Sequence, residues 1–310
     1  MSRSESIVFL QSEIAEITRQ LAEIGSEPSI ERPGLSSRLE ETREELERLQ
    51  EINGHLASAE LTFSGLPVIG TRALRADFAS SALEAYEKAV IGLAGSLTRG
   101  SLSRTARLPG RGQNQLFITS LARGSLGFQL EEMPSAEEAS GGDDRTVLAQ
   151  ALDRIQNILE ASTAEDEKLA ESIVEVDARV VSLLCNFTEV LARNGARCAV
   201  RIGPRRVSFG DDGQVLRALE RLSSDNVKQE TKTMTGTLVG VLPTPRQFEM
   251  QIDDGRILLG RIDQSLEIVD VKLLENHRVR TEVKITSVGR SDHAAMRGLM
   301  LKVEGGAEES

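Results

Sequence analysis

The stretch LAESIVEVDARVVSLLCNFTEVLARNG, residues 169–195, carries the most regular apolar pattern in the chain. Spacings of four and three residues alternate along it, which is the period at which one face of an α-helix is buried. Asn194 and Gly195 follow the pattern, as is typical of a helix C-terminus. The stretch therefore predicts one long buried helix. Its apolar positions are Leu169, Ile173, Val176, Val180, Leu183, Phe187 and Val190.

A second helix is predicted directly upstream, with Leu148, Leu152, Ile155 and Leu159 on one face. Ser162-Thr-Ala-Glu165 fits a capping box and predicts a break between the two helices. Downstream, residues 198–202 and 207–209 predict a short β-hairpin that turns at Gly203-Pro204. A further helix places Leu216, Leu219 and Leu222 inward. Residues 143–224 are interpreted as long helices plus a short hairpin.

The N-terminal residues 1–57 predict an acidic helical hairpin of the coiled-coil type. The first arm has an unbroken heptad seam, and the second arm continues after the break at 25–34, with Thr42 and Asn53 as polar interruptions. Arms of about 20 residues are too short to be stable alone, so they close on each other or self-associate with another chain. Both outcomes stay open, and the seam is a candidate assembly surface. The first seam is Ile7, Leu10, Ile14, Ile17, Leu21 and Ile24, and the second is Leu35, Leu39, Leu46, Leu49 and Leu56.

Residues 58–134 predict a small α/β unit. A strand around residues 61–63 ends before Pro67, and a helix follows from Arg72 to about Leu97. Residues 116–121 and 126–130 alternate as strands do, and Arg123-Gly124 lies between them as a hairpin turn.

The C-terminal residues 233–304 predict a small five-stranded β-barrel, which makes the whole chain an α+β protein. The predicted strands cover 237–242, 248–252, 257–262, 279–288 and 299–303, and Asp253-Asp254-Gly255 is a strong hairpin signal. Residues 266–274 predict a helix between the third and fourth strands. This arrangement is typical of an OB-like barrel, with an SH3-like barrel as the alternative. The polar residues 305–310 are interpreted as a frayed tail.

Charge is distributed unevenly along the chain. Its 310 residues include 48 acidic and 37 basic side chains, giving a net charge of −11. The acidity is concentrated in 1–57, with 12 acidic and 6 basic residues, and in 135–195, with 13 and 5. Residues 88–129, by contrast, contain no acidic side chain. Five arginines of this region are candidates for binding phosphates, the protein's own acidic helices or an acidic partner: Arg99, Arg104, Arg107, Arg111 and Arg123.

Aromatic residues are scarce, at 3% with no Trp and a single Tyr. This argues against a carbohydrate-binding protein and against a base-stacking platform, both of which use aromatic faces. The predicted barrel contains only Phe248. The barrel alone is therefore weak evidence for nucleic-acid binding.

No catalytic motif is present, and we predict no catalytic residue, no metal and no cofactor. Gly-Lys, HExxH, CxxC and GxSxG do not occur, and His55, His277 and His293 lie far apart in the sequence. The best enzymatic alternative is a metal-dependent nuclease built on Glu282 and Lys284, which share one face of a predicted strand. The further candidates for such a cluster are Asp270, Lys272, Asp253 and Asp254.

The remaining features predict a cytoplasmic protein. No apolar run is long enough to cross a membrane, and the two cysteines, Cys185 and Cys198, are too few for a disulfide framework. The leading hypothesis is a non-enzymatic scaffold or adaptor that assembles through its heptad helices. It would bind a protein partner through the basic α/β unit or the barrel. The alternative is a nucleic-acid-binding accessory protein that uses the arginine-rich loop at 98–123.

Overall fold

A computed structural model describes residues 2–25, 30–99, 115–122, 126–133, 145–289 and 294–305. Helices and strands are mixed, which confirms an α+β protein. The helices are α1 (Arg3–Ile24), α2 (Glu31–His55), α3 (Ala76–Arg99), α4 (Val147–Ala161), α5 (Asp166–Ile173), α6 (Ala178–Arg193), α7 (Asp212–Leu222) and α8 (Ile268–Leu273). The strands are β1 (Ser58–Gly65), β2 (Val68–Ile69), β3 (Ala73–Leu74), β4 (Leu116–Leu121), β5 (Leu126–Glu132), β6 (Ala196–Ile202), β7 (Arg205–Ser208), β8 (Val227–Leu242), β9 (Gln247–Ile252), β10 (Ile257–Ile262), β11 (Arg278–Val288) and β12 (Ala295–Gly305).

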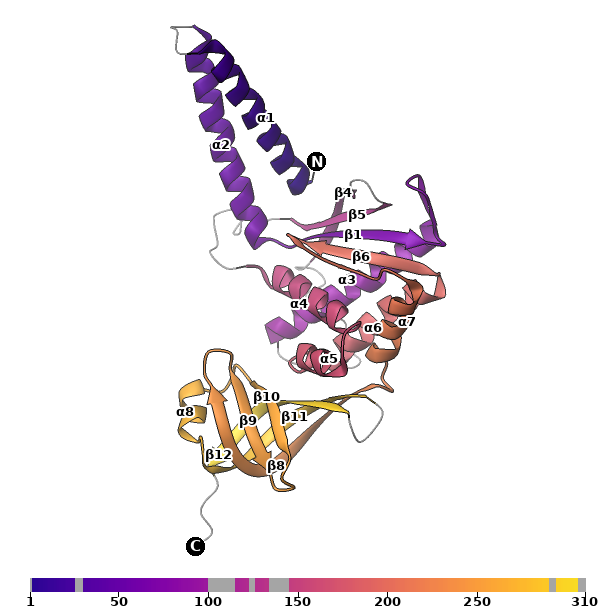
Figure 1. Cartoon of the computed structure of the whole chain (residues 1–310), viewed down its shortest axis with the longest axis vertical. Coiled ribbons are helices and arrows are strands. Elements are labelled where there is room, and N and C mark those ends of the chain that lie inside the picture. Colours follow the sequence, from indigo (N-terminus) through magenta and orange to yellow (C-terminus); the bar gives the residue numbers. More distant parts are fainter. Residues whose placement is uncertain are drawn as a thin grey trace.

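Helices α1 and α2 form an antiparallel hairpin that projects from the rest of the molecule (Figure 1). The predicted seam of α1 packs on α2 of the same chain, with Leu10 and Ile17 buried against a face that includes Leu39 and Thr42. Helix α2 begins earlier than predicted, so Pro33 lies in its first turn. Proline is tolerated there because the first backbone N–H groups of a helix have no intrahelical acceptor.

The two middle segments build one unit, whereas the sequence had suggested two. Strands β4, β5 and β1 from the first segment and β6 and β7 from the second form a single antiparallel sheet in the order β4-β5-β1-β6-β7. Helices α3, α4, α6 and α7 cover one face of this sheet (Figure 1). Their shared core includes Phe78, Tyr86, Leu152, Ile155 and Phe187.

The predicted long helix over the periodic stretch is wrong in one respect, because it is two helices. Helix α5 ends at Ile173 and α6 begins at Ala178. The carboxylate of Asp177 accepts a hydrogen bond from Arg179 N at 2.8 Å and caps α6. An aspartate that bonds a nearby backbone N–H favours a helix start over a helix interior. The apolar pattern continues through the break because both helices pack on the same core.

The C-terminal strands hydrogen-bond in the cyclic order β10-β12-β11-β8-β9 and close into a barrel. Four of the five pairings are antiparallel, and β10 pairs with β12 in parallel. Helix α8 lies between β10 and β11, as predicted. Strand β8 begins ten residues before its predicted start at 237. The start of β8, the end of β11 and the start of β12 extend to the α/β unit (Figure 1). Val288 and Ala295 belong to the core of that unit.

Candidate functional site: a groove on the barrel face

The predicted arginine site cannot be placed. Arg104, Arg107, Arg111 and Arg123 lie outside the described residues, and so does the side chain of Arg99 at the end of α3. Whether these arginines meet a phosphate, a partner or the acidic helices therefore stays a prediction.

The residues of the nuclease alternative are dispersed over the barrel. Glu282 pairs with Lys302 at 3.3 Å, and Asp253 pairs with Arg278 at 2.9 Å. Lys284 pairs with neither of these carboxylates, and its Nζ donates to the carbonyl oxygen of Val176 at 3.3 Å. Burial lowers the pKa of Lys284, and the nearby carboxylates oppose this shift. Among the described residues, no three Asp, Glu, His or Cys side chains are grouped to hold a metal ion.

The junction between the barrel and the α/β unit is built at the break between α5 and α6. The backbone carbonyls left free at the end of a helix need donors. Gln229 on β8 supplies one, because its Nε2 donates to Val176 O at 3.0 Å and to Ile173 O at 3.3 Å. Glu175, in the same break, lies 3.6 Å from the guanidinium of Arg261 on β10. These contacts hold α5 beside the outer face of the barrel.

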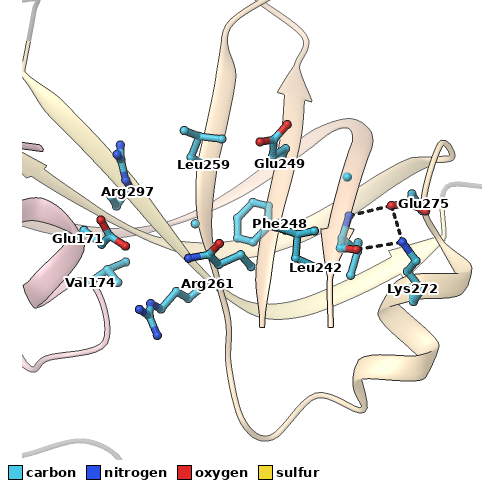
Figure 2. A pocket seen from close by; sticks show the side chains of 14 residues that line it. Glu171, Val174, Leu242, Phe248, Glu249, Leu259, Arg261, Lys272, Glu275 and Arg297 are labelled. Carbon is cyan, nitrogen blue, oxygen red and sulfur yellow. Dashed lines mark hydrogen bonds and ion pairs between the residues drawn. The ribbon is translucent and has the colours of Figure 1, made fainter. Parts of the chain in front are cut away.

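A groove of about 410 Å³ lies on the outer face of the barrel, next to α5. Its floor comes from β8, β9 and β10. Figure 2 shows Glu171 of α5 and Val174, which directly follows α5, on one side, with Lys272 and Glu275 at the other end. The floor follows from strand alternation. Phe248 of β9 is buried in the barrel, whereas Gln247 and its outward neighbours face the groove.

The outward positions of β8 and β10 include exposed aliphatic side chains, whereas those of β9 are polar. Register places Leu242, Gln247 and Arg261 in one row across the sheet, and Glu249 and Leu259 in the next. Scattered surface apolar residues are ordinary, but a contiguous exposed set indicates an interaction surface. Of the exposed aliphatic side chains of these strands, Leu242 (55%) and Leu259 (37%) line the groove, whereas Val239 (44%) and Ile257 (62%) lie outside its lining.

The end of the groove beside α8 is held rigid by hydrogen bonds. Glu275 accepts from Val241 N at 2.9 Å and from Lys272 Nζ at 2.8 Å, and Lys272 also donates to Val241 O at 2.9 Å. The hydrogen bond from Lys272 lowers the pKa of Glu275, with the Val241 N–H adding to the shift. Because both charges are satisfied locally, this end of the groove contributes shape more than charge.

The opposite end offers a cation. Arg297 on β12 lines the groove, and its Nη1 donates to Met296 O at 2.9 Å. None of the described residues brings a carboxylate oxygen within 4.0 Å of the Arg297 guanidinium. The charge of Arg261 is partly offset by Glu175, whose carboxylate lies 3.6 Å from its guanidinium. The same carboxylate lies 3.9 Å from the guanidinium of Arg154. A ligand with an apolar body and a carboxylate would find complementary groups along this groove.

The sequence contained one signal for this groove, a run of apolar residues in β10. Periodicity alone does not show which of these residues face the groove and which face the barrel core. Residues 257–259 have apolar side chains on both faces of β10, and only the outward ones remain exposed. Of the described residues lining the groove, Phe248 alone is aromatic, and its side chain is buried. The groove therefore lacks a stacking surface.

Two broader observations complete the description. In the described part of the chain, no helix combines the length and apolar character needed to span a membrane. No protein-family model matches this chain, and neither does any curated protein or solved structure.

Proposed function

We propose that the protein is a non-enzymatic cytoplasmic adaptor whose barrel groove binds a segment of a partner polypeptide. The observation that carries this proposal is the pair of exposed aliphatic side chains in the groove, Leu242 of β8 and Leu259 of β10, next to outward-facing polar side chains of β9. Partner-binding surfaces combine a desolvated apolar centre with polar groups that fix orientation. The chemistry fits a peptide with one or two apolar side chains and an acidic side chain directed to Arg297.

We further propose that the barrel is of the OB type. Its pairing order, the parallel pairing of β10 with β12, and the position of α8 before the fourth strand support this assignment over an SH3-like barrel. OB folds bind their ligands on the face of the second and third strands. Here those strands are β9 and β10, which form the floor of the groove.

The surface chemistry favours a polypeptide over a nucleic acid. Binding of single strands in OB folds depends on aromatic side chains that stack on bases and on a positively charged groove. Among the described lining residues, the three basic side chains Arg261, Lys272 and Arg297 are balanced by Glu171, Glu249 and Glu275. Aliphatic contacts and an even charge balance suit a peptide.

The projecting hairpin is proposed as an assembly arm. Its first helix has 22 residues and is therefore about 33 Å long at roughly 1.5 Å per residue. Val8 and Phe9 remain exposed on it after the seam has packed on α2. A second hairpin could cover these side chains, as in coiled-coil assemblies.

The groove is tested by selecting ligands from a displayed library of random linear peptides. Selected peptides should bind the wild-type protein and lose affinity by about tenfold or more when Leu242 and Leu259 are both changed to Asp, as expected for central apolar contacts. The matched control is Ile69→Asp, which changes an apolar residue of 70% exposure on β2. An equal loss in the control, or no selected peptide, overturns the groove assignment.

The assembly arm is tested separately by light scattering coupled to size-exclusion chromatography. Self-association that is lost in Phe9→Glu supports the arm, and a wild-type protein that stays monomeric at high micromolar concentration overturns it.

A further inference from the structure

A cleft lined by three arginines lies away from the barrel, at the base of the hairpin. This cleft of about 650 Å³ is bounded by the end of α2, the residues around the start of α4 and the turn between β6 and β7. The charged side chains that line it are Arg145, Arg201 and Arg205, together with the carboxylates Glu60 and Asp153. Asn53, Ser58 and Gln129 add neutral polar groups.

Three arginines enter the cleft from different elements. Arg201 ends the outward row of β6, and Arg205 begins β7 after the tight turn at Gly203-Pro204, where Gly203 has a φ of +54°. Arg145 precedes α4. Register pairs Arg205 with Ile202 and Arg201 with Arg206, so Arg201 and Arg205 lie on opposite faces at the tip of this hairpin.

These guanidinium groups retain donors for a ligand. Arg201 lies 4.0 Å from Glu60, and Arg205 pairs with Glu160 at 2.9 Å. Arg145 pairs with Asp153. Each of these arginine side chains is about half exposed, and exposed ion pairs hold their partners weakly. A guanidinium carries five N–H donors, so one carboxylate leaves several unused.

A fourth arginine, Arg206, adds positive charge at this tip beside the cleft but does not line it. Arg206 lies directly opposite Arg201 in the antiparallel register of β6 and β7. Like charges directly opposite each other in a sheet destabilise the pairing. No carboxylate oxygen of the described residues lies within 4.0 Å of the Arg206 guanidinium. An anion bound between Arg201 and Arg206 would relieve this repulsion.

We propose that the cleft binds a small ligand carrying two or more phosphoryl groups. Guanidinium groups bind phosphoryl oxygens through paired N–H bonds, and several of them together suit a multiply charged anion. Asn53 adds an amide at the wall of the cleft. None of the described lining residues is aromatic, so the phosphoryl groups, and not a stacked base, carry recognition. This site is independent of the proposed barrel groove.

The test uses titration calorimetry of the full chain with sodium tripolyphosphate, pyrophosphate and orthophosphate. The wild type should bind tripolyphosphate most tightly, and Arg201→Gln with Arg205→Gln should weaken it by about tenfold or more, because two charge-assisted contacts are lost. The control pair, Arg19→Gln with Arg193→Gln, removes the same charge from exposed helical positions and should leave the affinity unchanged. Far-UV circular dichroism checks that both variants fold.

Three results would overturn the proposal. The first is the absence of tripolyphosphate binding to the wild type, and the second is an equal loss in the control pair. The third is binding of a labelled oligo(dT) strand that depends on Arg201 while tripolyphosphate neither binds nor competes, since this would indicate a nucleic-acid backbone site. Arg206→Gln alone should give an intermediate loss of tripolyphosphate affinity.

Discussion

The guanidinium of Arg3, at the start of the hairpin, donates a hydrogen bond to the carbonyl oxygen of Ala57 at 2.7 Å. Ala57 directly precedes β1, so this bond joins the first helix to the central sheet. The backbone N–H of Arg3 bonds the carboxylate of Glu131 at 3.1 Å, and Glu132 accepts from Ala57 N at 2.8 Å. Burial lowers the pKa of Arg3, and the two glutamates oppose this shift. The cluster anchors the hairpin.

Replacing Arg3 should therefore destabilise the whole protein. Arg3→Gln leaves Glu131, which is 1% exposed, and Glu132 without their cation, and we expect a loss of about 2–4 kcal/mol in the free energy of unfolding. Urea titration measures this value. Arg19→Gln, at an exposed ion pair on the same helix, should leave it nearly unchanged. Equal effects of the two substitutions would contradict the anchoring role.

The cap of α6 gives a second prediction. Asp177→Ala removes the acceptor for Arg179 N and should cost about 0.5–2 kcal/mol of unfolding free energy. Asp177→Asn keeps a capping oxygen and should cost less than the alanine variant. Thermal or urea unfolding of the two variants compares them. If alanine were as stable as asparagine, the helix break would have another cause.

Closure of the barrel depends on a close backbone approach at Gly260. A Cβ at this position would lie 2.0 Å from the carbonyl oxygen of Gly298, on the strand paired in parallel. Gly260→Ala should lower the free energy of unfolding by about 1–3 kcal/mol, because the two strands must move apart to accommodate the methyl group. Gly240→Ala is the control, since its Cβ would meet nothing closer than 3.8 Å. We expect urea unfolding to show a clear loss only for Gly260→Ala.

The pH dependence of stability tests the burial of Cys198. Burial raises the pKa of this thiol in the folded protein, whereas an unfolded thiol ionises near about pH 8.5. Below that pH the thiol is protonated in both states. As the pH rises above this value, the thiol of the unfolded state loses its proton first, so the free energy of unfolding falls. This one group lowers the unfolding free energy by up to about 1.4 kcal/mol per pH unit.

The measurement compares wild type with Cys198→Ala between about pH 7.5 and 9.5. The variant should lose less stability over this range, whatever its absolute stability at the lower pH. Lys284 acts in the opposite direction, because its folded pKa is lowered by burial and its contribution to stability grows as the pH rises. Both proteins contain Lys284, so the difference between them isolates Cys198. Identical slopes would contradict the burial of this thiol.

Local patterns predicted most of the elements correctly. The heptad seam of α1, the strands at 116–121 and 257–262, and the helix before β11 all follow from spacing and turn residues over a few positions. The error at the long periodic stretch arose because one side chain competed with the apolar pattern. Asp177 interrupts a perfect apolar period, because periodicity describes which face is buried and does not describe where the backbone hydrogen bonds end.

The candidate sites were much less predictable. The predicted arginines lie in one basic stretch of sequence, whereas the cleft draws Arg145, Arg201 and Arg205 from separate elements. The groove likewise combines β8, β9 and β10 with Glu171 of α5 and Val174, which directly follows α5. Neither set has a spacing that reveals it, since residues far apart in sequence meet only after the strands have paired.

By itself, the sequence determined the kinds of elements, the heptad seam of the first hairpin arm and the scarcity of aromatic groups that disfavours base stacking. The tertiary structure decided the rest. It merged two apparent units into one sheet, closed the barrel at Gly260 and Gly298, and aligned Arg206 opposite Arg201. The physical reason is that apolar periodicity and turn chemistry act over a few residues. Strand register and close backbone approach, by contrast, depend on partners that are far apart in the sequence.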